Sequence, residues 1–336
     1  MAASAPSPTR SWRALWVSVL LTVLGYLAFS LWGGWSEVTS ALGRVGALGM
    51  GVALGLSTLN YGLRFLRWQT WLRTLGHRIP WGPSLQIYIA GFALTTTPGK
   101  AGEALRSVYL KPLGVSYPES LAAFFVERLT DVLSVLLLAC LGLSLYPPAR
   151  PVALGVGLVV GAVLLFLLVP RLLPAVVRQG VWMRRDPSAP MGRVQRLLEH
   201  AGTAFTHARS CLRPPVLGLG LLLGVVGWGA EGLALYWILQ WLGADVSLHL
   251  ALFIFAFAML IGAVSFLPGG LGGAELTLLG LLTLNGVGEA DAVAATVLIR
   301  LTTLWYSVAL GALCVAFLRQ TGRAGVGPGQ LADKTE

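Results

Sequence analysis

Apolar stretches separated by short polar connections run along the whole chain of 336 residues. Two of them, 152–169 and 216–239, approach or exceed the roughly 18–20 residues that a helix needs to cross a bilayer core. The pattern predicts six such helices, at about 14–32, 46–66, 118–146, 151–170, 214–242 and 291–318. We therefore expect an all-α membrane protein, with residues 1–336 forming a single integral membrane domain.

Two further apolar stretches are interrupted where a crossing helix would have to be continuous. Residues 83–111 are broken at Pro98-Gly99, and residues 250–285 are broken at Pro268 and the four glycines that follow it. Non-helical backbone at membrane depth is tolerated only where it is buried in protein or lines a water-filled cavity. We interpret both stretches as re-entrant hairpins of broken helices, which enter and leave the membrane on the same side.

The two breaks belong to a longer internal repeat. Each break ends in a glutamate, Glu103 or Glu275, and an Arg-Leu-Thr triplet follows each glutamate 25 residues later, at Arg128 and Arg300. Two Pro-Gly breaks, two glutamates and two triplets in matched order indicate two copies of one unit. We place the copies at about 46–146 and 214–318.

The distribution of charge predicts how the chain is oriented. Only 11% of the residues are charged, against about 25% in globular proteins, and the net charge of +10 is concentrated in the segments 67–82, 171–213 and 319–323. We expect the protein to lie in the cell (inner) membrane. If neither hairpin crosses that membrane, the positive-inside rule places these segments and both termini on its cytoplasmic side. The hairpins then enter from opposite sides, so the two units form an inverted-topology repeat, a plan common to many transporters.

The basic segment 171–213 contains an amphipathic stretch. Its apolar residues follow the i, i+3, i+4 spacing of one helix face, at Val194, Leu197, Leu198, Ala201, Phe205 and Ala208. One interpretation is a helix lying on the bilayer surface, and the other is a solvated helix packed on neighbouring loops.

The glutamates at the two breaks have a structural and a functional interpretation. Each lies near the start of a helix, where a carboxylate caps free N–H groups and complements the helix dipole. Alternatively, each pairs with an arginine on the other repeat or carries a proton during coupled transport. Arg64 and Arg67, beside Trp68, are expected to anchor their helix at the cytoplasmic interface.

Burying a charge in a membrane costs several kcal/mol, so a charged residue inside a predicted span usually belongs to an ion pair or to a substrate pathway. Such residues are therefore the candidates for substrate contact. Arg128 and Asp131 share a helix face at i, i+3. The functional interpretation is that Arg128 and Arg300 bind a lipid phosphate, whose geometry suits the planar arginine fork; the structural one is a set of ion pairs within the bundle. The candidate substrate-binding residues are Arg128, Arg300, Lys100, Glu103, Glu275, Glu127, Asp131, Gly99, Gly269 and Gly270.

Other chemistry finds no support in the sequence. The three cysteines, Cys140, Cys211 and Cys314, share no close spacing, and the four histidines are scattered among connecting segments. No phosphate-binding loop and no nucleophile–base arrangement occurs. We therefore expect no metal, no cofactor, no catalytic residue and no nucleic-acid partner, and we do not expect an enzyme.

Four motifs in order resemble a known family. Arg64-x-x-Arg-Trp68, Thr97-Pro-Gly-Lys-x-Gly-Glu103, Glu127-Arg-x-x-Asp131 and Pro268-Gly-Gly-x-Gly-x-x-Glu275 are similar to the lysylphosphatidylglycerol synthase transmembrane region family, also called flippase-like, over roughly residues 15–320. The resemblance implies movement of lipids between leaflets, including aminoacylated phosphatidylglycerol, hopanoids and polyprenyl-phosphate-linked sugars. This chain ends soon after its last predicted span, so the resemblance implies the membrane part without the aminoacyltransferase domain of the synthases.

These observations predict a lipid translocator for an anionic phospholipid or a polyprenyl-phosphate-linked lipid, with membrane lipid as its partner. Two alternatives stay open. A small-solute or ion transporter predicts a site sealed from lipid. A non-catalytic membrane partner of a lipid- or glycan-modifying enzyme predicts no transport in isolation. A homo-oligomer is compatible with each of them.

Overall fold

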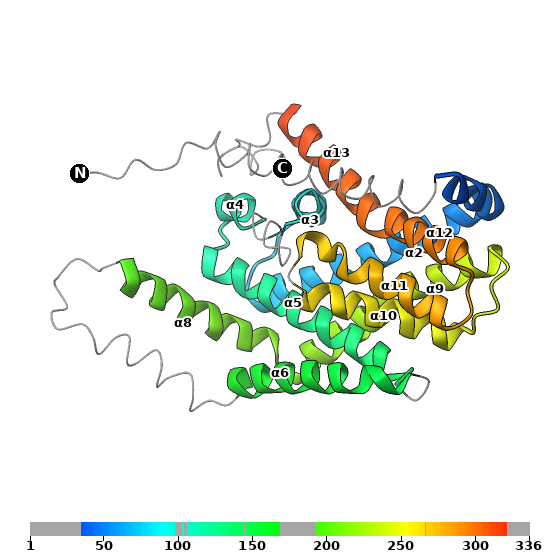
Figure 1. The fold of residues 1–336 in the computed structure, drawn as a ribbon. Helices are drawn as coiled ribbons and strands as arrows, with labels where there is room; N and C mark the ends of the chain where they lie inside the picture. Colours follow the sequence, from blue (N-terminus) through cyan, green and yellow to red (C-terminus); the bar gives the residue numbers. More distant parts are fainter. Residues whose placement is uncertain are drawn as a thin grey trace, which may run out of the picture.

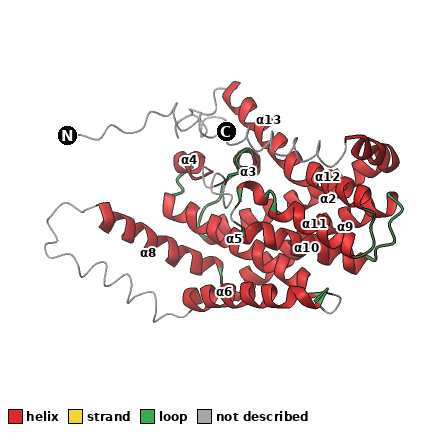
Figure 2. Ribbon diagram, viewed as in Figure 1, coloured by secondary structure: helices red, strands yellow, loops and turns green. Residues whose placement is uncertain are grey.

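The computed structural model describes residues 35–97, 103, 106–143, 146–168, 193–265 and 267–320, and every regular element in these ranges is helical (Figure 2). The predicted first span at 14–32 and the break at Pro98-Gly99 lie outside the described residues. The helices are α2 (Trp35–Thr74), α3 (Trp81–Phe92), α4 (Arg106–Leu110), α5 (Tyr117–Cys140), α6 (Arg150–Leu168), α8 (Arg193–Cys211), α9 (Pro214–Trp241), α10 (Leu248–Val264), α11 (Gly273–Leu284), α12 (Glu289–Arg300) and α13 (Tyr306–Gln320).

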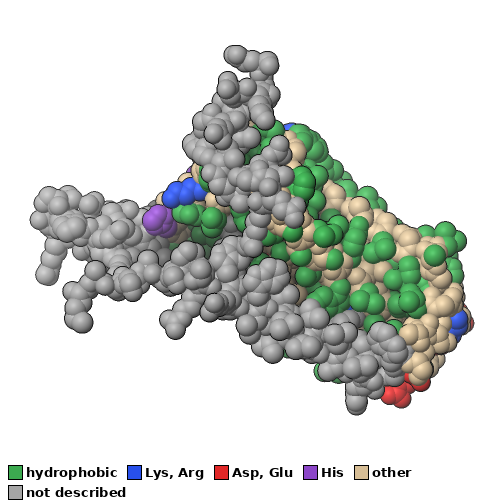
Figure 3. Space-filling view, turned by 90° about the horizontal axis from the view of Figure 1, so that it is seen from above, with side chains coloured by type: hydrophobic (Ala, Val, Ile, Leu, Met, Phe, Trp, Pro, Cys, Tyr) green, Lys and Arg blue, Asp and Glu red, His purple; other side chains and the backbone are tan. Residues whose placement is uncertain are grey.

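Four helical segments are long and apolar enough to cross a membrane: Ser36–Thr74, Pro147–Leu167, Pro214–Trp241 and Glu289–Leu318. The shorter helix α10 is also apolar. Hydrophobic side chains are spread over the described surface seen from above, with few charged ones among them (Figure 3). The protein is therefore a helical membrane protein, as the hydropathy pattern predicts.

Helix α2 includes the predicted helix at 46–66 and extends past its end. It begins at Trp35, but its backbone is non-helical at Gly46 (φ 64°), where the predicted helix starts, and it continues to Thr74 instead of ending near residue 66. The last two turns stay helical because Trp68, Trp71 and Leu72 pack in the interior and because no glycine or proline occurs between Gly62 and Gly76. Residues 67–74, which follow the predicted end of this helix, therefore belong to α2.

The described helices after residue 146 begin and end within a few residues of their predicted bounds, whereas α5 stops at Cys140, several residues before 146. In the stretch 83–111, α3 already ends at Phe92 and α4 covers Arg106–Leu110. Local sequence explains these starts. Ser116 and Glu119 form a capping box at α5, in which the Glu119 carboxylate accepts from the Ser116 N–H at 2.8 Å. Ser247 caps α10 by accepting from the Leu250 N–H at 3.3 Å.

The predicted last span is divided by a π-helical turn. The turn covers Leu301–Trp305 and joins α12 to α13 directly after Arg300. Within it, the carbonyl oxygen of Thr303 accepts a hydrogen bond from the hydroxyl of Tyr61 in α2. Such turns occur frequently at functional sites because they re-aim the side chains next to them.

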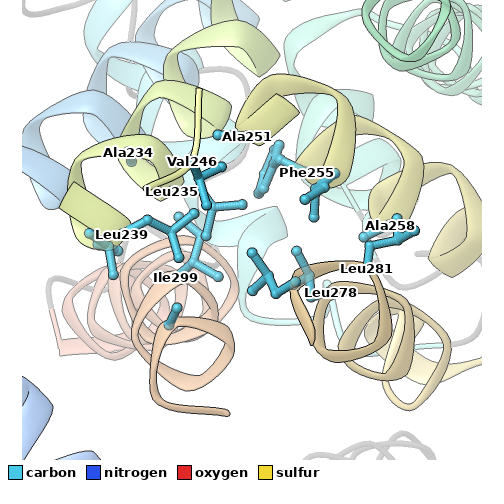
Figure 4. Packing of buried hydrophobic residues seen from close by; sticks show 14 of the residues in the cluster. Ala234, Leu235, Leu239, Val246, Ala251, Phe255, Ala258, Leu278, Leu281 and Ile299 are labelled. Atoms are coloured by element: carbon cyan, nitrogen blue, oxygen red, sulfur yellow. The ribbon is translucent and has the colours of Figure 1, made fainter. Parts of the chain in front are cut away.

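A hydrophobic cluster joins α9, α10, α11 and α12 to one another and to residues of α2 and α5 (Figure 4). It combines small and large side chains, and van der Waals packing of this kind contributes to helix association in lipid. Its labelled members come from α9 (Ala234, Leu235, Leu239), the following loop (Val246), α10 (Ala251, Phe255, Ala258), α11 (Leu278, Leu281) and α12 (Ile299).

Contacts between the two halves of the chain are reciprocal (Figure 1). Helices α2 and α9 pack along each other. Helix α5 packs on α9 and α10, while α12 packs on α2 and α13 packs on α3. The last helix of each half therefore contacts the first helix and the broken segment of the other half.

The amphipathic helix α8 has protein on part of its apolar face. It packs along α5, and the ring of Phe205 lies 6.5 Å from Phe125 and 5.8 Å from Phe166. Ala208 and Cys211 are buried. This end of α8 is thus held by helices of the bundle.

Candidate functional site

The matched glutamates and arginines of the two units meet in space. The Nη2 atom of Arg128 lies 3.5 Å from a carboxylate oxygen of Glu103, and the Nε atom of Arg300 lies 2.6 Å from a carboxylate oxygen of Glu275. Each glutamate pairs with the arginine that follows it by 25 residues in the same unit. The expectation that they pair across the two repeats was wrong, because each break folds back onto the last helix of its own unit.

The second break depends on its glycines and is fastened by Arg300. Gly269 and Gly270 have φ values of 64° and 70°, a conformation that other residues adopt only at a cost. A Cβ atom on Gly270 would lie 3.1 Å from the Cα atom of Gly262 in α10. The Nη2 group of Arg300 donates to the carbonyl oxygen of Gly269 at 2.9 Å, so the arginine and the break form one unit.

Glu275 caps its helix as predicted and also pairs with an arginine of its own unit. One carboxylate oxygen accepts from the backbone N–H of Gly272 at 2.7 Å, which caps the start of α11. The other accepts from Arg300. Arg300 keeps donor capacity, since its Nη1 group contacts the thioether sulfur of Met259 at 3.8 Å, a weak acceptor.

Glu103 and Glu127 anchor the corresponding network of the first unit. Glu103 accepts from Arg106 at 2.6 Å and from the hydroxyl of Thr95 at 3.0 Å. Glu127 is fully buried and lies 3.0 Å from Arg106, 2.8 Å from Arg128 and 3.2 Å from Arg64. Several arginines thus share each carboxylate, as a desolvated charge cluster requires.

Arg64 and Arg67 belong to this buried network. They are 5% and 0% exposed, and Asp131 pairs with both of them and also with Arg128 at 3.1 Å. The expectation that they anchor α2 at the cytoplasmic interface was wrong. The two arginines are spaced i, i+3 on α2, and the acids that they face, Glu127 and Asp131, are spaced i, i+4 on α5. This matched spacing is the sequence signal that indicates pairing.

A cavity of about 290 Å³ lies between the two units. Its polar wall joins residues of both units, and Arg128 and Arg300 both face it although 172 residues separate them in the chain (300 − 128 = 172). The polar and glycine residues of the wall are Tyr61, Arg64, Thr95, Arg128, Asp131, Glu231, Gly262, Gly269, Gly270, Arg300, Thr303 and Ser307.

The cavity has an apolar side as well. Phe92, Trp228 and Met259 line it together with aliphatic residues. The guanidinium of Arg64 lies 5.7 Å from the ring centres of both Phe92 and Trp228, and the Trp228 indole donates to Asp131 at 3.2 Å. A cavity lined by both arginines and apolar side chains suits an amphipathic ligand.

The structure thus brings together five of the ten predicted substrate-binding residues at the cavity wall: Arg128, Arg300, Asp131, Gly269 and Gly270. Glu103, Glu127 and Glu275 hold those arginines from behind the wall. Gly99 and Lys100 lie outside the described residues. Among the described residues, no three His, Cys, Asp or Glu side chains group together as metal ligands would.

Comparison with known proteins agrees with this architecture. The family model described as "Lysylphosphatidylglycerol synthase TM region" matches residues 14–311. A UPF0104 membrane protein of Methanothermobacter thermautotrophicus is 26% identical over 312 residues, which cover 87% of this chain and 90% of that protein. UPF0104 membrane protein PH1989 of Pyrococcus horikoshii is 24% identical over 277 residues, covering 74% and 81%.

One relative carries an enzyme name. Glycosyltransferase AglD of Haloferax volcanii is 32% identical over 119 residues, which cover 35% of this chain and 19% of that protein. The similarity is therefore confined to one part of each chain.

Proposed function

Because the chain belongs to the lysylphosphatidylglycerol synthase transmembrane region family, we propose that it moves a lipid with an anionic headgroup between the two leaflets of a membrane. The lipid is an anionic phospholipid or a polyprenyl-phosphate-linked lipid. The protein is a multi-pass membrane protein. We propose that it has six spans and two re-entrant hairpins, with both termini in the cytoplasm.

The reciprocal packing supports a repeat of two units, and the antiparallel packing of α2 on α9 favours an inverted one, since a Cβ atom on Gly220 would lie 3.7 Å from Arg67 and one on Gly49 would lie 2.8 Å from the ring of Trp241. An axis that exchanges the two units exchanges α2 with α9 and the hairpin α3–α4 with α10–α11. It also exchanges α5 with α12–α13. The contacts between α5 and α10 and between α13 and α3 are equivalent under this exchange, as are those of α5 with α9 and of α12 with α2. The matched pairs Glu103–Arg128 and Glu275–Arg300 follow the same exchange.

The observation that carries the proposed function is the shared cavity. It exposes one arginine from each unit, Arg128 and Arg300, beside the broken backbone at Gly269 and Gly270. Guanidinium groups bind phosphate through two parallel hydrogen bonds. A phosphate that enters can accept hydrogen bonds from the guanidinium groups of Arg128 and Arg300, which now donate to Glu103 and Glu275. Each arginine then exchanges one anionic partner for another and is never buried without one.

The mechanism follows from the position of this cavity. The headgroup phosphate meets Arg128 and Arg300, while the acyl or prenyl tails stay in lipid. Because each arginine is fastened to the break or network of its own unit, a movement of one unit against the other changes the leaflet to which the cavity opens. Alternating exposure of one central site then carries the headgroup across.

Reconstitution into liposomes tests this function. Fluorescent phospholipid and polyprenyl-phosphate analogues are scored for leaflet accessibility with and without the protein. We expect the protein to equilibrate one of these classes and the variants Arg128→Ala and Arg300→Ala to lose at least about tenfold in rate, the loss of one charge-assisted contact of about 1.5–3 kcal/mol. Wild-type rates in folded variants would show that the assigned site is wrong.

A paired substitution separates a binding role of Arg300 from a structural one. The double variant Glu275→Gln with Arg300→Met removes both charges of the pair and leaves the carboxamide oxygen of Gln to cap the Gly272 N–H. A purely structural ion pair predicts that this variant translocates lipid normally. The proposed function predicts that it stays inactive, and Arg150→Ala, at an exposed position away from the cavity, is the matched active control.

A second candidate function is that of a membrane partner for a glycan-modifying enzyme. The partial match to a glycosyltransferase favours it. In that case the purified chain translocates none of the lipids alone, and translocation or glycan transfer appears only when the enzyme is added. The liposome experiment therefore distinguishes the two functions.

A further inference from the structure

The cavity is lined by matched residues of the two units. Each unit contributes residues at i, i+3, i+4 and i+7 of its last helical segment, and the members of each pair are 172 residues apart, as Arg128 and Arg300 are. The pairs are Arg128 and Arg300, Asp131 and Thr303, Val132 and Leu304, and Val135 and Ser307. Because this spacing follows one helix face, both units turn the same face toward one space.

The cavity opens to the surface on the side of α5 and α10, which pack along each other (Figure 1). Of the described residues that line it, Ala263 at the end of α10 and Leu267 directly before the second break are exposed, Leu267 to 45%. Arg128 and Val132 of α5 are half-buried, whereas the lining residues of α2, α9, α11, α12 and α13 are buried. The mouth of the cavity therefore lies between α5 and the end of α10.

The rim of this mouth is apolar apart from one arginine. Val132 and Leu267 contribute aliphatic side chains, and the half-buried Met259 contributes its thioether. Val264, beside the rim on α10, is exposed as well. An exposed apolar patch that is continuous with a binding cavity marks contact with lipid or with an apolar part of the ligand. Arg128 alone brings charge to the rim, where a headgroup and its tails would separate.

The matched place in the first unit is closed. Ala93 and Ala263 each lie five residues before the proline of their break (98 − 93 = 5; 268 − 263 = 5). A Cβ atom on Gly311 of α13 would lie 2.1 Å from the backbone nitrogen of Ala93, so α13 lies directly on the end of α3. Thr97 and Leu267, each directly before its proline, are 7% and 45% exposed. The first unit thus has no mouth beside its break among the described residues.

Helices α5 and α10 also approach each other closely, but farther from the break. A Cβ atom on Gly142, just after α5, would lie 2.3 Å from the ring of Phe253. Phe253 precedes Pro268 by 15 residues (268 − 253 = 15). This helix pair is therefore closed at its far end and open beside the break, whereas α13 and α3 are closed beside theirs.

We propose that the mouth between α5 and α10 is a lipid portal, through which acyl or prenyl tails extend into the bilayer while the headgroup stays at Arg128 and Arg300. The portal rests on the proposed function and adds the path of the substrate to it. Leu267 sets the width of the opening. A ligand that uses this path carries long apolar tails, which distinguish it from a free phosphate.

The closed contact between Gly311 and Ala93 is the matched portal of the other unit. When the units move against each other, this contact opens and the mouth beside Leu267 closes, since the two places are equivalent under the exchange of units. The cavity then opens to the other leaflet.

Photolabelling of the purified full chain in liposomes tests the portal without any transport assay. The probes are phosphatidylglycerol and a polyprenyl phosphate, each with a diazirine near the headgroup end of a tail, and labelled residues are located by mass spectrometry. We expect one probe to label Val135, which lines the cavity and is 3% exposed, because only a tail that passes the mouth can reach it. Label confined to exposed positions away from the cavity, such as Leu284, would overturn the portal.

Variants of the rim assign the path. Leu267→Trp narrows the mouth from the break and Val132→Trp narrows it from α5, so each should lose the label on Val135 and slow lipid movement. Two variants on different elements keep the test valid if one of them fails to fold. Leu284→Trp is the matched control, because Leu284 is exposed at the end of α11 and does not line the cavity. Label that persists in both rim variants, or that is lost in the control, contradicts the assignment.

A disulfide tests the matched portal. The Sγ atom of Cys314 in α13 lies 3.3 Å from the carbonyl oxygen of Gln86 in α3, so Gln86→Cys can pair with it in a chain whose other two cysteines are replaced. We expect oxidation to stop lipid movement, to leave the label on Val135 in place, and to be reversed by reduction. Lipid movement in the fully cross-linked chain would reject the exchange of portals.

The portal and the proposed function fail separately. Label on Val135 that both rim variants abolish, in protein that moves no lipid, retains the portal as a lipid-binding path and rejects translocation. Lipid movement without label inside the cavity retains the function and rejects the portal.

Discussion

At the residue scale, arginine decides how this bundle is built. Arg64, Arg67, Arg106 and Arg300 are almost fully buried, and Arg128 is 19% exposed at its side chain. Each of the five meets a carboxylate. Removing one partner of a buried pair leaves an uncompensated charge, whereas removing both is often tolerated.

The pair of Glu275 and Arg300 gives the cleanest test of this rule, because it stands apart from the network of the first unit. We expect Arg300→Met to lower the free energy of unfolding by about 3–5 kcal/mol. The double variant with Glu275→Gln should recover most of this loss. Equilibrium unfolding in detergent measures both, and a double variant as unstable as the single one would contradict the ion-pair explanation.

At the scale of elements, the break before α11 is fixed by backbone geometry. Gly270 adopts φ 70° and lies against Gly262, so α10 and the break approach each other closely. A side chain at this position meets both a conformational and a steric penalty. The same break places the Gly269 carbonyl beneath Arg300, which links the element to the cavity.

Gly270→Ala tests this geometry. We expect it to lower the free energy of unfolding by about 1–3 kcal/mol, because a left-handed conformation costs other residues about 1–2 kcal/mol before any clash. Gly280→Ala is the matched control, since Gly280 lies within α11 and a Cβ atom there would meet nothing within 4 Å. Thermal unfolding compares the two, and equal stability would show that the break tolerates a side chain.

At the scale of the whole molecule, the inverted topology that we propose makes a prediction about sides. Two re-entrant hairpins would place Arg78 and Lys111 on one side of the membrane and Asp245 and Glu289 on the other. All four positions are exposed, which suits labelling of single cysteines in a chain whose three native cysteines have been replaced. A full crossing of either segment would place its two flanking positions on opposite sides.

Impermeant thiol labelling of intact cells and of inside-out vesicles measures this arrangement. We expect Asp245→Cys and Glu289→Cys to react from outside, and Arg78→Cys and Lys111→Cys to react only in the vesicles. Labelling of Lys111→Cys from outside the cell would show that residues 83–111 cross the membrane and would reject the inverted repeat.

The sequence by itself determined the helical membrane class, the described helices to within a few residues in most cases, and the matched residues of the two units. These features depend on local composition and spacing, which a hydropathy pattern records directly. The 25-residue spacing from Glu103 to Arg128 and from Glu275 to Arg300 was visible in the chain, and it marked pairs that meet in the structure.

Only the tertiary structure decided which charges face which. Arg64 and Arg67 looked like interfacial anchors, because a basic helix end beside a tryptophan is typical of one; packing of α2 on α5 turned them inward to Asp131. Glu103 and Glu275 pair with arginines of their own units. The polar atoms of Ser57 and Asn60 are buried without a hydrogen-bond partner among the described residues because of the register of α2 against α9. The glycines of α9 allow this register, and no local sequence pattern predicts it.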